Sequence, residues 1–265
     1  MLPRVNLIST DNDKYLLFST NDVISTSLYH RGVWDEVVLK LSELFVREEV
    51  SPVVFDIGAN LGAYTIPIPI AKSISKNNGA VYSFEPQRII YYQLCGNVFL
   101  NSLDNVYVFN NAISSEVGSI EMPEIDYFSN WNIGAFSIDE ESRKKRGVEY
   151  KRNNDTFSVG TLNLNSITGD HNVSVVKIDV EGFELDVLNG AHDFLERYNY
   201  PPFFFECWEL DWFADKRKAL FDEVKKLGYD VFKIGDEDYI AQNMKHKKYF
   251  DIKFESGRIE INKIK

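Results

Sequence analysis

The stretch "SPVVFDIGANLGAYTI", residues 51–66, decides the fold that we expect of this chain. It begins with an apolar run at 53–57 that contains one acid, Asp56, and it continues with two glycines and a helix-like segment. A short apolar run that leads through a glycine turn into a helix is typical of a buried strand in a parallel sheet. The turn after such a strand lies at the edge of the sheet where small ligands bind.

The same alternation of apolar runs and helical segments continues along the chain. Further strands are predicted at 80–84, 105–109, 173–178 and 202–206, and helices at about 87–102, 183–197 and 214–227. Two last apolar segments flank the turn "GDE" and are expected to add an antiparallel strand. Short strands separated by helices predict an α/β fold, with a mostly parallel seven-stranded sheet that is covered by helices on both faces.

Small β additions are expected at both ends of a single domain that spans 1–265. Residues 1–50 are predicted to form a hairpin followed by one helix, with Val37 on the apolar face of that helix. Residues 51–243 are expected to form the α/β core, and 244–265 a second hairpin. The run 139–155 is dense in charge and poor in aliphatic residues, which favours a solvated loop or an exposed helix. The alternative is a basic cluster that guides an anionic substrate.

Composition limits the functions that the chain can have. With 29 Lys and Arg against 40 Asp and Glu, the net charge is −11, so we expect no nucleic-acid partner. We find no signal peptide and no apolar run long enough to span a bilayer, and the two cysteines, Cys95 and Cys207, are expected to be reduced. These features predict a cytoplasmic protein without a membrane span, and they leave its oligomeric state open.

The turn after the first core strand, "DIGANLG", carries Asp56, Gly58, Asn60 and Gly62. A dinucleotide site would need G-x-G-x-x-G, whereas these glycines are spaced G-x-x-x-G. The glycines still permit a close backbone approach, and amides at a helix start favour a carboxylate. Asp56 beside them suits an ammonium group, so the turn favours a nucleotide that carries an amino acid.

The next two strand ends complete a predicted nucleoside pocket. Glu85 follows the second strand, where an acid accepts hydrogen bonds from the two hydroxyls of a ribose. Asn110 and Asn111 follow the third strand, where an amide can read the edge of adenine. Together with the turn at Asp56, these residues point to S-adenosylmethionine as the ligand.

Four segments resemble the FkbM family of methyltransferases: "VVFDIGANLGAYT", "FEPQRIIYYQLCGNVFLNSLDNV", "NNAIS" and "VVKIDVEGFELDVLNGA". The resemblance covers about residues 51–230. It implies a Rossmann-like methyltransferase fold, S-adenosylmethionine as donor, and O-methylation, commonly of sugar hydroxyls in glycans or natural products. By this likeness Ala112, in the "NNA" turn, joins the residues above in lining the donor site.

Methyl transfer to a hydroxyl needs a base near the oxygen, and two acids follow the fourth core strand. Asp179 and Glu181 are the candidate bases, while helix capping by Asp179 is the structural alternative. Glu184 and Asp186, further along, are expected at the surface. Glu206 ends the fifth strand, and with Asp179 it could either hold Mg²⁺ or Mn²⁺ or act as base and orienting group.

Aromatic residues are the candidates for the acceptor surface, because the apolar faces of sugars stack on aromatic rings. Trp34, Trp131 and Trp208 stand in loops or at the starts of elements, and we favour Trp131 with Asn132 in "FSNWNIGAFS". His30 is a further candidate base. The sequence thus predicts an O-methyltransferase that acts on a sugar or glycan. The alternatives are a nucleotide-dependent oxidoreductase and a non-catalytic binding module.

Overall fold

The structure is a computed structural model. It describes residues 4–19, 22–68, 79–125, 127, 134, 136–146, 152–255 and 257–265, with the backbone alone for 152–155. No helix in these ranges is both long enough and apolar enough to cross a membrane. The cytoplasmic location stays a prediction.

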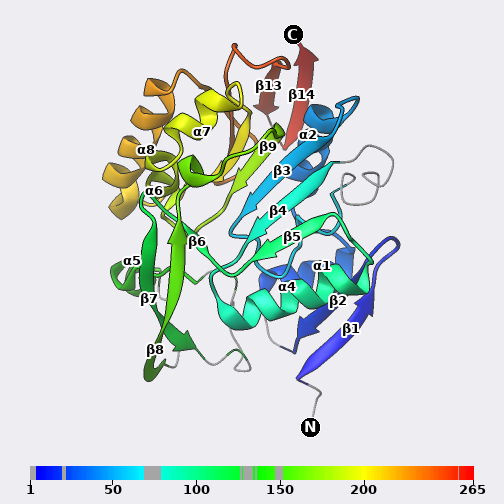
Figure 1. The fold of residues 1–265 in the computed structure, drawn as a ribbon, viewed down its shortest axis with the longest axis vertical. Helices are drawn as coiled ribbons and strands as arrows, with labels where there is room; N and C mark the ends of the chain where they lie inside the picture. Colours follow the sequence, from blue (N-terminus) through cyan, green and yellow to red (C-terminus); the bar gives the residue numbers. More distant parts are fainter. Residues whose placement is uncertain are drawn as a thin grey trace.

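A seven-stranded sheet forms the centre of the molecule (Figure 1), in the order β11-β12-β10-β9-β3-β4-β5. Its strands are β3 (Pro52–Ile57), β4 (Ala80–Phe84), β5 (Val106–Phe109), β9 (Asn172–Ile178), β10 (Phe203–Glu206), β11 (Asp230–Lys233) and β12 (Asp238–Gln242). Only β12 runs antiparallel to its two neighbours, and the other pairings are parallel. The predicted mostly parallel sheet is confirmed.

Helices cover both faces of this sheet because its strands are apolar on both sides. On β3, the side chain of Val54 joins a core cluster with residues of α2 (Glu36–Val46), while Phe55 joins a second cluster. The second cluster contains residues of α6 (Glu184–Asn189), α7 (His192–Arg197) and α8 (Ala214–Lys226). Figure 1 shows these three helices across the strands from α4 (Arg88–Leu100). The single helix predicted at 183–197 is therefore two helices, which separate at Gly190.

The N-terminal hairpin is present as predicted, from β1 (Val5–Ser9) and β2 (Lys14–Phe18). Polar side chains of α4 hold it: the backbone nitrogen of Leu16 donates to Asn97 Oδ1 at 2.7 Å, and Gln93 Nε2 donates to the carbonyl of Leu16 at 2.7 Å. The prediction of one helix after the hairpin is wrong, because α1 (Val23–Arg31) precedes α2. Val37 is also 39% exposed, so the buried face of α2 is rotated from the predicted one.

The chain segment between β5 and β9 forms a second, three-stranded sheet that was not predicted. This sheet consists of β6 (Ala112–Ile113), β7 (Gly118–Ile125) and β8 (Arg152–Leu162), in the order β6-β8-β7. The charged run includes a short helix, α5 (Glu140–Lys145), but Arg143 is buried and donates to the carbonyl oxygens of Ser137 and Ile138. The described part of the run, 139–146, is thus only partly solvated.

Short elements complete the described chain. The 3₁₀ turns η2 (Leu164–Ser166) and η3 (Asp211–Phe213) precede β9 and α8. The predicted C-terminal hairpin is confirmed by the antiparallel pair β13 (Phe250–Glu255) and β14 (Arg258–Lys263). It packs beside α2, where the rings of Phe45 and Phe250 meet edge to face with centroids 5.1 Å apart.

The stability of the fold depends on the aromatic packing beneath β3. Phe194 is fully buried, with its ring centroid 5.2 Å from that of Phe55. We expect Phe194→Ala to lower the free energy of unfolding by about 3–5 kcal/mol, because truncation leaves a cavity in the core. Phe99 is 84% exposed, so Phe99→Ala should change it by less than about 0.5 kcal/mol. Urea denaturation of the two variants measures the difference, and equal losses would contradict the assignment of the core.

Candidate functional site

The strand order reverses at β3, which has β4 on one side and β9 on the other. In an open α/β sheet, ligands bind beyond the carboxyl ends of the strands at such a reversal. A cavity of about 480 Å³ lies there, lined by residues that follow β3, β4, β5 and β9 and by Glu206 at the end of β10. Its volume is typical of a site for a small organic molecule.

The turn after β3 approaches the end of β9 so closely that only glycine fits. Gly58 has φ +81°, and a Cβ on it would lie 1.8 Å from the carbonyl oxygen of Asp179. The backbone nitrogens of Gly58 and Ala59 both donate to the carbonyl of Phe84, which fixes the turn to β4 as well. Gly62 also has a positive φ, and its hydrogen faces the side chain of Leu94. Gly58 lines the cavity, whereas Gly62 serves the packing of the turn.

Glu85 lies in the cavity wall at the end of β4, as predicted, and is 4% exposed. Its Oε2 accepts from the backbone nitrogen of Asn60 at 2.9 Å, and its Oε1 accepts from that of Gln87 at 2.8 Å. Burial raises the pKa of Glu85 to about 7, although the two backbone donors oppose the shift. The carboxylate is thereby fixed in one orientation, and Asn60 itself lines the cavity at φ +50°.

The "NNA" turn after β5 divides into a supporting residue and two wall residues. Asn110 donates from Nδ2 to the carbonyls of Glu85 and Pro86, at 2.9 and 3.0 Å, and it does not line the cavity. Asn111 and Ala112 do line it. The amide of Asn111 also donates to the carbonyl of Gly160 at 3.1 Å, which ties this wall to β8.

Asp56 is not in the cavity wall, so the prediction that it meets an ammonium group of the ligand is wrong. Alternation along β3 places its side chain on the same face as Val54, inside the protein, where it is 0% exposed. Its Oδ2 accepts from Thr65 Oγ1 at 2.6 Å. Burial raises the pKa of Asp56, and the charge of Lys177 opposes that shift.

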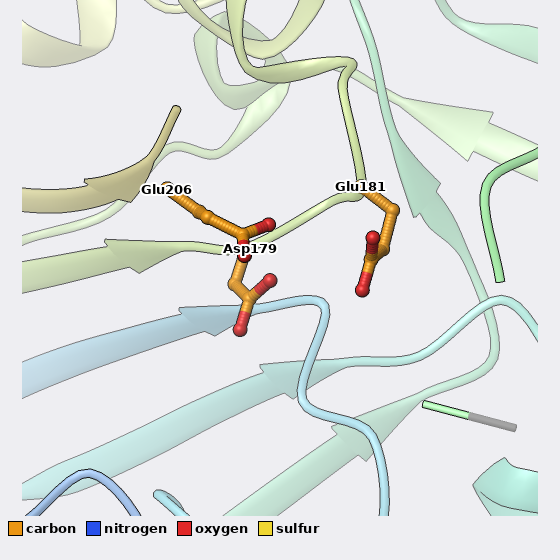
Figure 2. Close-up of side chains that lie close together, drawn as sticks. All are labelled: Asp179, Glu181 and Glu206. Carbon is orange, nitrogen blue, oxygen red and sulfur yellow. The ribbon is translucent and has the colours of Figure 1, made fainter. Parts of the chain in front are cut away.

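Three carboxylates meet on the other side of the cavity (Figure 2). Asp179 follows β9, Glu181 lies in the next loop, and Glu206 ends β10; one oxygen of each lies within 4.8 Å of the others. Glu181 has φ +55° and the following Gly182 has φ +96°, which turns the chain so that Glu181 faces the other two acids. The sequence predicted each acid, and the tertiary structure brings them together.

Each of these carboxylates accepts a hydrogen bond from a nearby side chain. Lys177 Nζ donates to Asp179 Oδ2 at 2.7 Å, and Arg146 Nη1 donates to Glu181 Oε2 at 2.7 Å. Trp208 Nε1 donates to Glu206 Oε2 at 3.1 Å. The guanidinium carbon of Arg146 also lies 4.4 Å from the centroid of the Trp208 ring. The donors orient the acids toward a common point.

Protonation of the cluster is shifted toward neutral pH. Burial, followed by the charge of Asp179, raises the pKa of Glu181 to about 8, while Arg146 opposes the rise. Burial, followed by the charge of Glu181, raises the pKa of Glu206 well above its ordinary value. Lys177 behaves differently: burial disfavours its charge, but Asp179, Asp56 and Asp35 outweigh that and raise its pKa. The cluster can thus hold or accept a proton near neutral pH.

The same three acids are a donor set for a hard cation. Mg²⁺ and Mn²⁺ prefer carboxylate oxygens, and Asp179, Glu181 and Glu206 can each offer one. The predicted pair of Asp179 and Glu206 therefore has a third potential ligand in Glu181. Because Arg146 and Lys177 already neutralise two of the acids, the geometry also suits catalysis without a metal.

Another part of the cavity wall is acidic and contains one of the predicted tryptophans. Trp34 lines it, next to Asp35, with Asp236 and Glu237 from the turn between β11 and β12 and Asp238 at the start of β12. Burial raises the pKa of Asp35 to about 7 and that of Asp238 to about 6. This wall offers carboxyl oxygens and an aromatic side chain.

Trp208 and His30 are two further predicted residues that do not line the cavity. Trp208 is 1% exposed and packs against Phe213 in the core, so the prediction that it stacks on a substrate is wrong. His30 lies near the end of α1, is exposed and does not line the cavity, so it is not placed to act as a base there. Trp131 and Asn132 lie outside the described residues.

The sequence analysis did not identify Arg146, Gln87 or Lys177 as residues of the site, and it misplaced Glu184 and Asp186. Arg146 and Gln87 line the cavity, and Lys177 is buried beneath it. Glu184 is 2% exposed, not at the surface as predicted, because its Oε1 accepts from the nitrogens of Val180 and Gly182, at 3.2 and 3.3 Å. Asp186 lines the cavity.

The alternative prediction, that Asp179 caps the next helix, is also wrong. Phe183 is the N-cap residue of α6, and no side chain caps that helix there.

The amino-acid sequence matches the family model described as the methyltransferase FkbM domain over residues 56–257. A methyltransferase of Sordaria araneosa, sdnD, is 27% identical over 183 residues, which are 60% of this chain and 63% of sdnD. The hexuronic acid methyltransferase AglP of Haloferax volcanii is 26% identical over 178 residues, which are 64% of this chain and 61% of AglP. The chain thus spans less than two thirds of the length of these two relatives.

Solved structures show a weaker likeness. A precorrin-6y C5,15-methyltransferase of Geobacter metallireducens is 12% identical, with a TM-score of 0.43 over 81% of this chain and 92% of that one. A SAM-dependent O-methyltransferase of Thermotoga maritima is 11% identical, with a TM-score of 0.44 over 97% and 71%. At these values neither structure bears on the residues of the site.

The stability of the loop that follows β9 should depend on whether Glu184 is protonated. Burial raises the pKa of Glu184 to about 7, so its stabilising contribution is complete below its ordinary value of 4.5 and is lost as the pH rises through 7. Glu184→Gln keeps an acceptor for the two amides but cannot ionise. We expect the free energy of unfolding to fall less for this variant between pH 4.5 and 7.5, by on the order of 2 kcal/mol.

Thermal or urea unfolding at several pH values measures this slope. Glu196 is exposed, so Glu196→Gln is the matched control and should keep the slope of the unchanged protein. If Glu184→Gln also keeps that slope, Glu184 is ionised in the folded protein at pH 5, and its assigned protonation is wrong.

Proposed function

This chain belongs to the methyltransferase FkbM family, and we propose that it moves a methyl group from S-adenosylmethionine to a hydroxyl of a sugar. The matched residues form an S-adenosylmethionine-dependent methyltransferase domain. What we propose beyond this is that the acceptor is a sugar and that the methyl group is transferred to an oxygen atom. One observation carries it: a single cavity joins the buried Glu85 to the cluster of Asp179, Glu181 and Glu206.

The donor end of the cavity suits a nucleoside that carries an amino acid. Glu85 presents a fixed carboxylate to a pair of ribose hydroxyls, and the bare backbone at Gly58 allows the ligand to approach. S-adenosylmethionine, when bound, supplies a methyl group on a positively charged sulfur. The excess of carboxylates over Arg146 in the described wall favours that positive charge.

The acceptor end suits a molecule with several hydroxyls. Hydroxyl groups donate hydrogen bonds to carboxylates, and Asp35, Asp236 and Asp238 provide acceptors there, beside the ring of Trp34. The relative AglP is named for hexuronic acid, which supports a sugar. A uronate would add a further negative charge to this acidic wall, so we propose a neutral sugar.

Glu181 is the proposed base. A base works best when its pKa lies near the working pH, and burial places that of Glu181 at about 8. Arg146 holds Oε2 of Glu181, which fixes the carboxyl group beside Glu206. Asp179, held by Lys177 beside Glu181, is the group that we assign to orienting the hydroxyl. Alignment of the acceptor oxygen with the methyl group supplies much of the remaining acceleration.

The alternatives from the sequence have lost support. The family match covers the turn with G-x-x-x-G spacing. A nucleotide-dependent oxidoreductase would be expected to have G-x-G-x-x-G at that turn. A non-catalytic binding module would not need the clustered acids with pKa values raised toward neutrality.

Labelled transfer tests the reaction directly. The protein is incubated with S-adenosylmethionine that carries an isotopic methyl group and with pairs of neutral glycosides and their uronic acid counterparts. We expect the label on an oxygen of the neutral sugar, at a rate at least about tenfold above that of the uronate, because one unfavourable charge costs on the order of 1.4 kcal/mol or more. Mass spectrometry of the products locates the methyl group. A faster reaction of the uronate would contradict the neutral acceptor.

Variants of the acids test the base. We expect Glu181→Gln to lower the single-turnover rate by about 10²–10⁴-fold, because the amide keeps the shape and removes the basicity. In the unchanged protein the rate should fall as the pH drops below about 8, the pKa of Glu181, and the variant should lose this limb of the profile. Asp179→Asn should cost less. If Asp179→Asn lowers the rate more than Glu181→Gln does, Asp179 is the base. If both variants keep near-normal rates, Glu206 is the remaining candidate base.

Exhaustive chelation with EDTA is the companion measurement. If methyl transfer continues after this treatment, the result supports a role of the three acids in binding and removing a proton. Transfer that stops, and returns with Mg²⁺ or Mn²⁺, assigns Asp179, Glu181 and Glu206 to a bound cation instead.

A further inference from the structure

Trp208 is a buried side chain beside the three acids, and the proposed reaction gives it no role. It follows the end of β10 and is 1% exposed. A buried indole normally satisfies its N–H with an acceptor inside the protein. In this structure the acceptor is Glu206 Oε2, at 3.1 Å. The indole N–H of Trp208 is therefore bound to one of the carboxylates of the cluster.

The face of the same ring contacts the partner of a second acid. The guanidinium carbon of Arg146 lies 4.4 Å from the ring centroid, a distance at which the face of an indole attracts a cation. Arg146 Nη1 donates to Glu181 Oε2 at 2.7 Å. Arg146 thus contacts both the ring and the carboxylate, so the ring fixes the donor that orients Glu181.

The edge of the ring supports the turn that carries Glu181. A Cβ on Gly182 would lie 3.1 Å from both Cη2 and Cζ3 of Trp208, closer than an ordinary van der Waals contact. Glu181 has φ +55° and Gly182 has φ +96°, so the backbone is in the left-handed region at two successive residues. The ring edge limits how far this turn can move toward Trp208.

Trp208 is itself held in place from several sides. Its ring centroid lies 4.9 Å from that of Phe213 and 5.9 Å from that of Trp212. Its carbonyl oxygen accepts from Arg217 Nη1 at 3.2 Å. A ring that is packed in this way keeps one rotamer, so its contacts with the acid cluster have a fixed geometry.

We propose that Trp208 is a positioning residue for methyl transfer, because one indole sets the places of two acids relative to each other. Its N–H orients Glu206. Its face and its edge orient Glu181, through Arg146 and Gly182 respectively. Like charges repel, so carboxylates whose oxygens lie within 4.8 Å of one another need such a support. The inference rests on the proposed function in taking this cluster as the place where the acceptor hydroxyl reacts, whichever acid removes the proton.

Two substitutions separate the N–H from the ring. Trp208→Phe keeps an aromatic face for Arg146 and removes the donor to Glu206, whereas Trp208→Leu removes both. We expect the single-turnover rate to fall about tenfold for Trp208→Phe, because one hydrogen bond to an acid is lost. It should fall about a hundredfold for Trp208→Leu, because both acids then move from their places around the reacting oxygen. The affinity for S-adenosylhomocysteine and the KM of the acceptor should change by less than about threefold.

Trp212→Phe is the matched control, since it makes the same change in the neighbouring ring. Lys145 Nζ lies over that ring, 5.1 Å from its centroid, and we expect the variant to keep the rate of the unchanged protein. Equal losses for Trp208→Phe and Trp208→Leu would show that the ring does not hold Arg146, and normal rates for both would show that Trp208 does not position the acids. Either result overturns the inference. So does a loss of donor affinity that matches the loss of rate, because a purely structural role predicts that result.

A measurement without an acceptor separates this inference from the proposed function. The indole N–H of Trp208 gives a resonance in the NMR spectrum of the nitrogen-labelled protein, and its absence from the Trp208→Phe variant assigns it. We expect Glu206→Leu to move this resonance upfield, because the N–H loses its acceptor. Glu196→Gln, at the surface, should leave it in place.

An unmoved resonance in Glu206→Leu overturns the inference. A moved resonance together with no transfer to any sugar contradicts the proposed function, while it supports the contact on which the inference rests. If Trp208→Leu does not fold, the rate of Trp208→Phe and the resonance still decide the role of Trp208.

Discussion

The contact between Gly58 and the carbonyl of Asp179 is the constraint on which the site depends. Two parallel strands, β3 and β9, end side by side, and the chain turns away from each in a different direction. The turn after β3 passes so close to the end of β9 that a single Cβ would overlap a backbone oxygen. The close approach joins the donor end of the cavity to the acids that follow β9. A wider junction would separate the groups that the reaction needs together.

Burial then determines what those groups can do. Water would keep Glu85, Glu181 and Glu206 ionised near neutral pH, whereas the cavity raises the pKa of each. The positive charges of Lys177 and Arg146 limit the cost of gathering so many acids. Lys177 is paired with Asp179 and Arg146 with Glu181, whereas Glu206 accepts a hydrogen bond from the uncharged Trp208 ring. In the proposed reaction, one of these acids orients the hydroxyl while another accepts its proton.

The elements between β5 and β9 complete the site from outside the central sheet. α5 brings Arg146 to Glu181, and its guanidinium lies over the ring of Trp208, which in turn holds Glu206. Met122 of β7 and Phe136 add apolar side chains to the cavity wall. The acids and the donor end therefore both depend on a region that the sheet alone does not position.

The sequence by itself determined the central sheet, because the apolar runs at β3, β4, β9 and β10 must be buried on both faces. It also placed Glu85, Asp179 and Glu206 at strand ends, since the carboxyl ends of parallel strands meet at one edge. Only the tertiary structure decided which side chains reach the cavity. Asp56 and Trp208 are buried by the face on which their neighbours pack, while Arg146, remote in sequence from the acids, reaches Glu181 through contacts that no local pattern records.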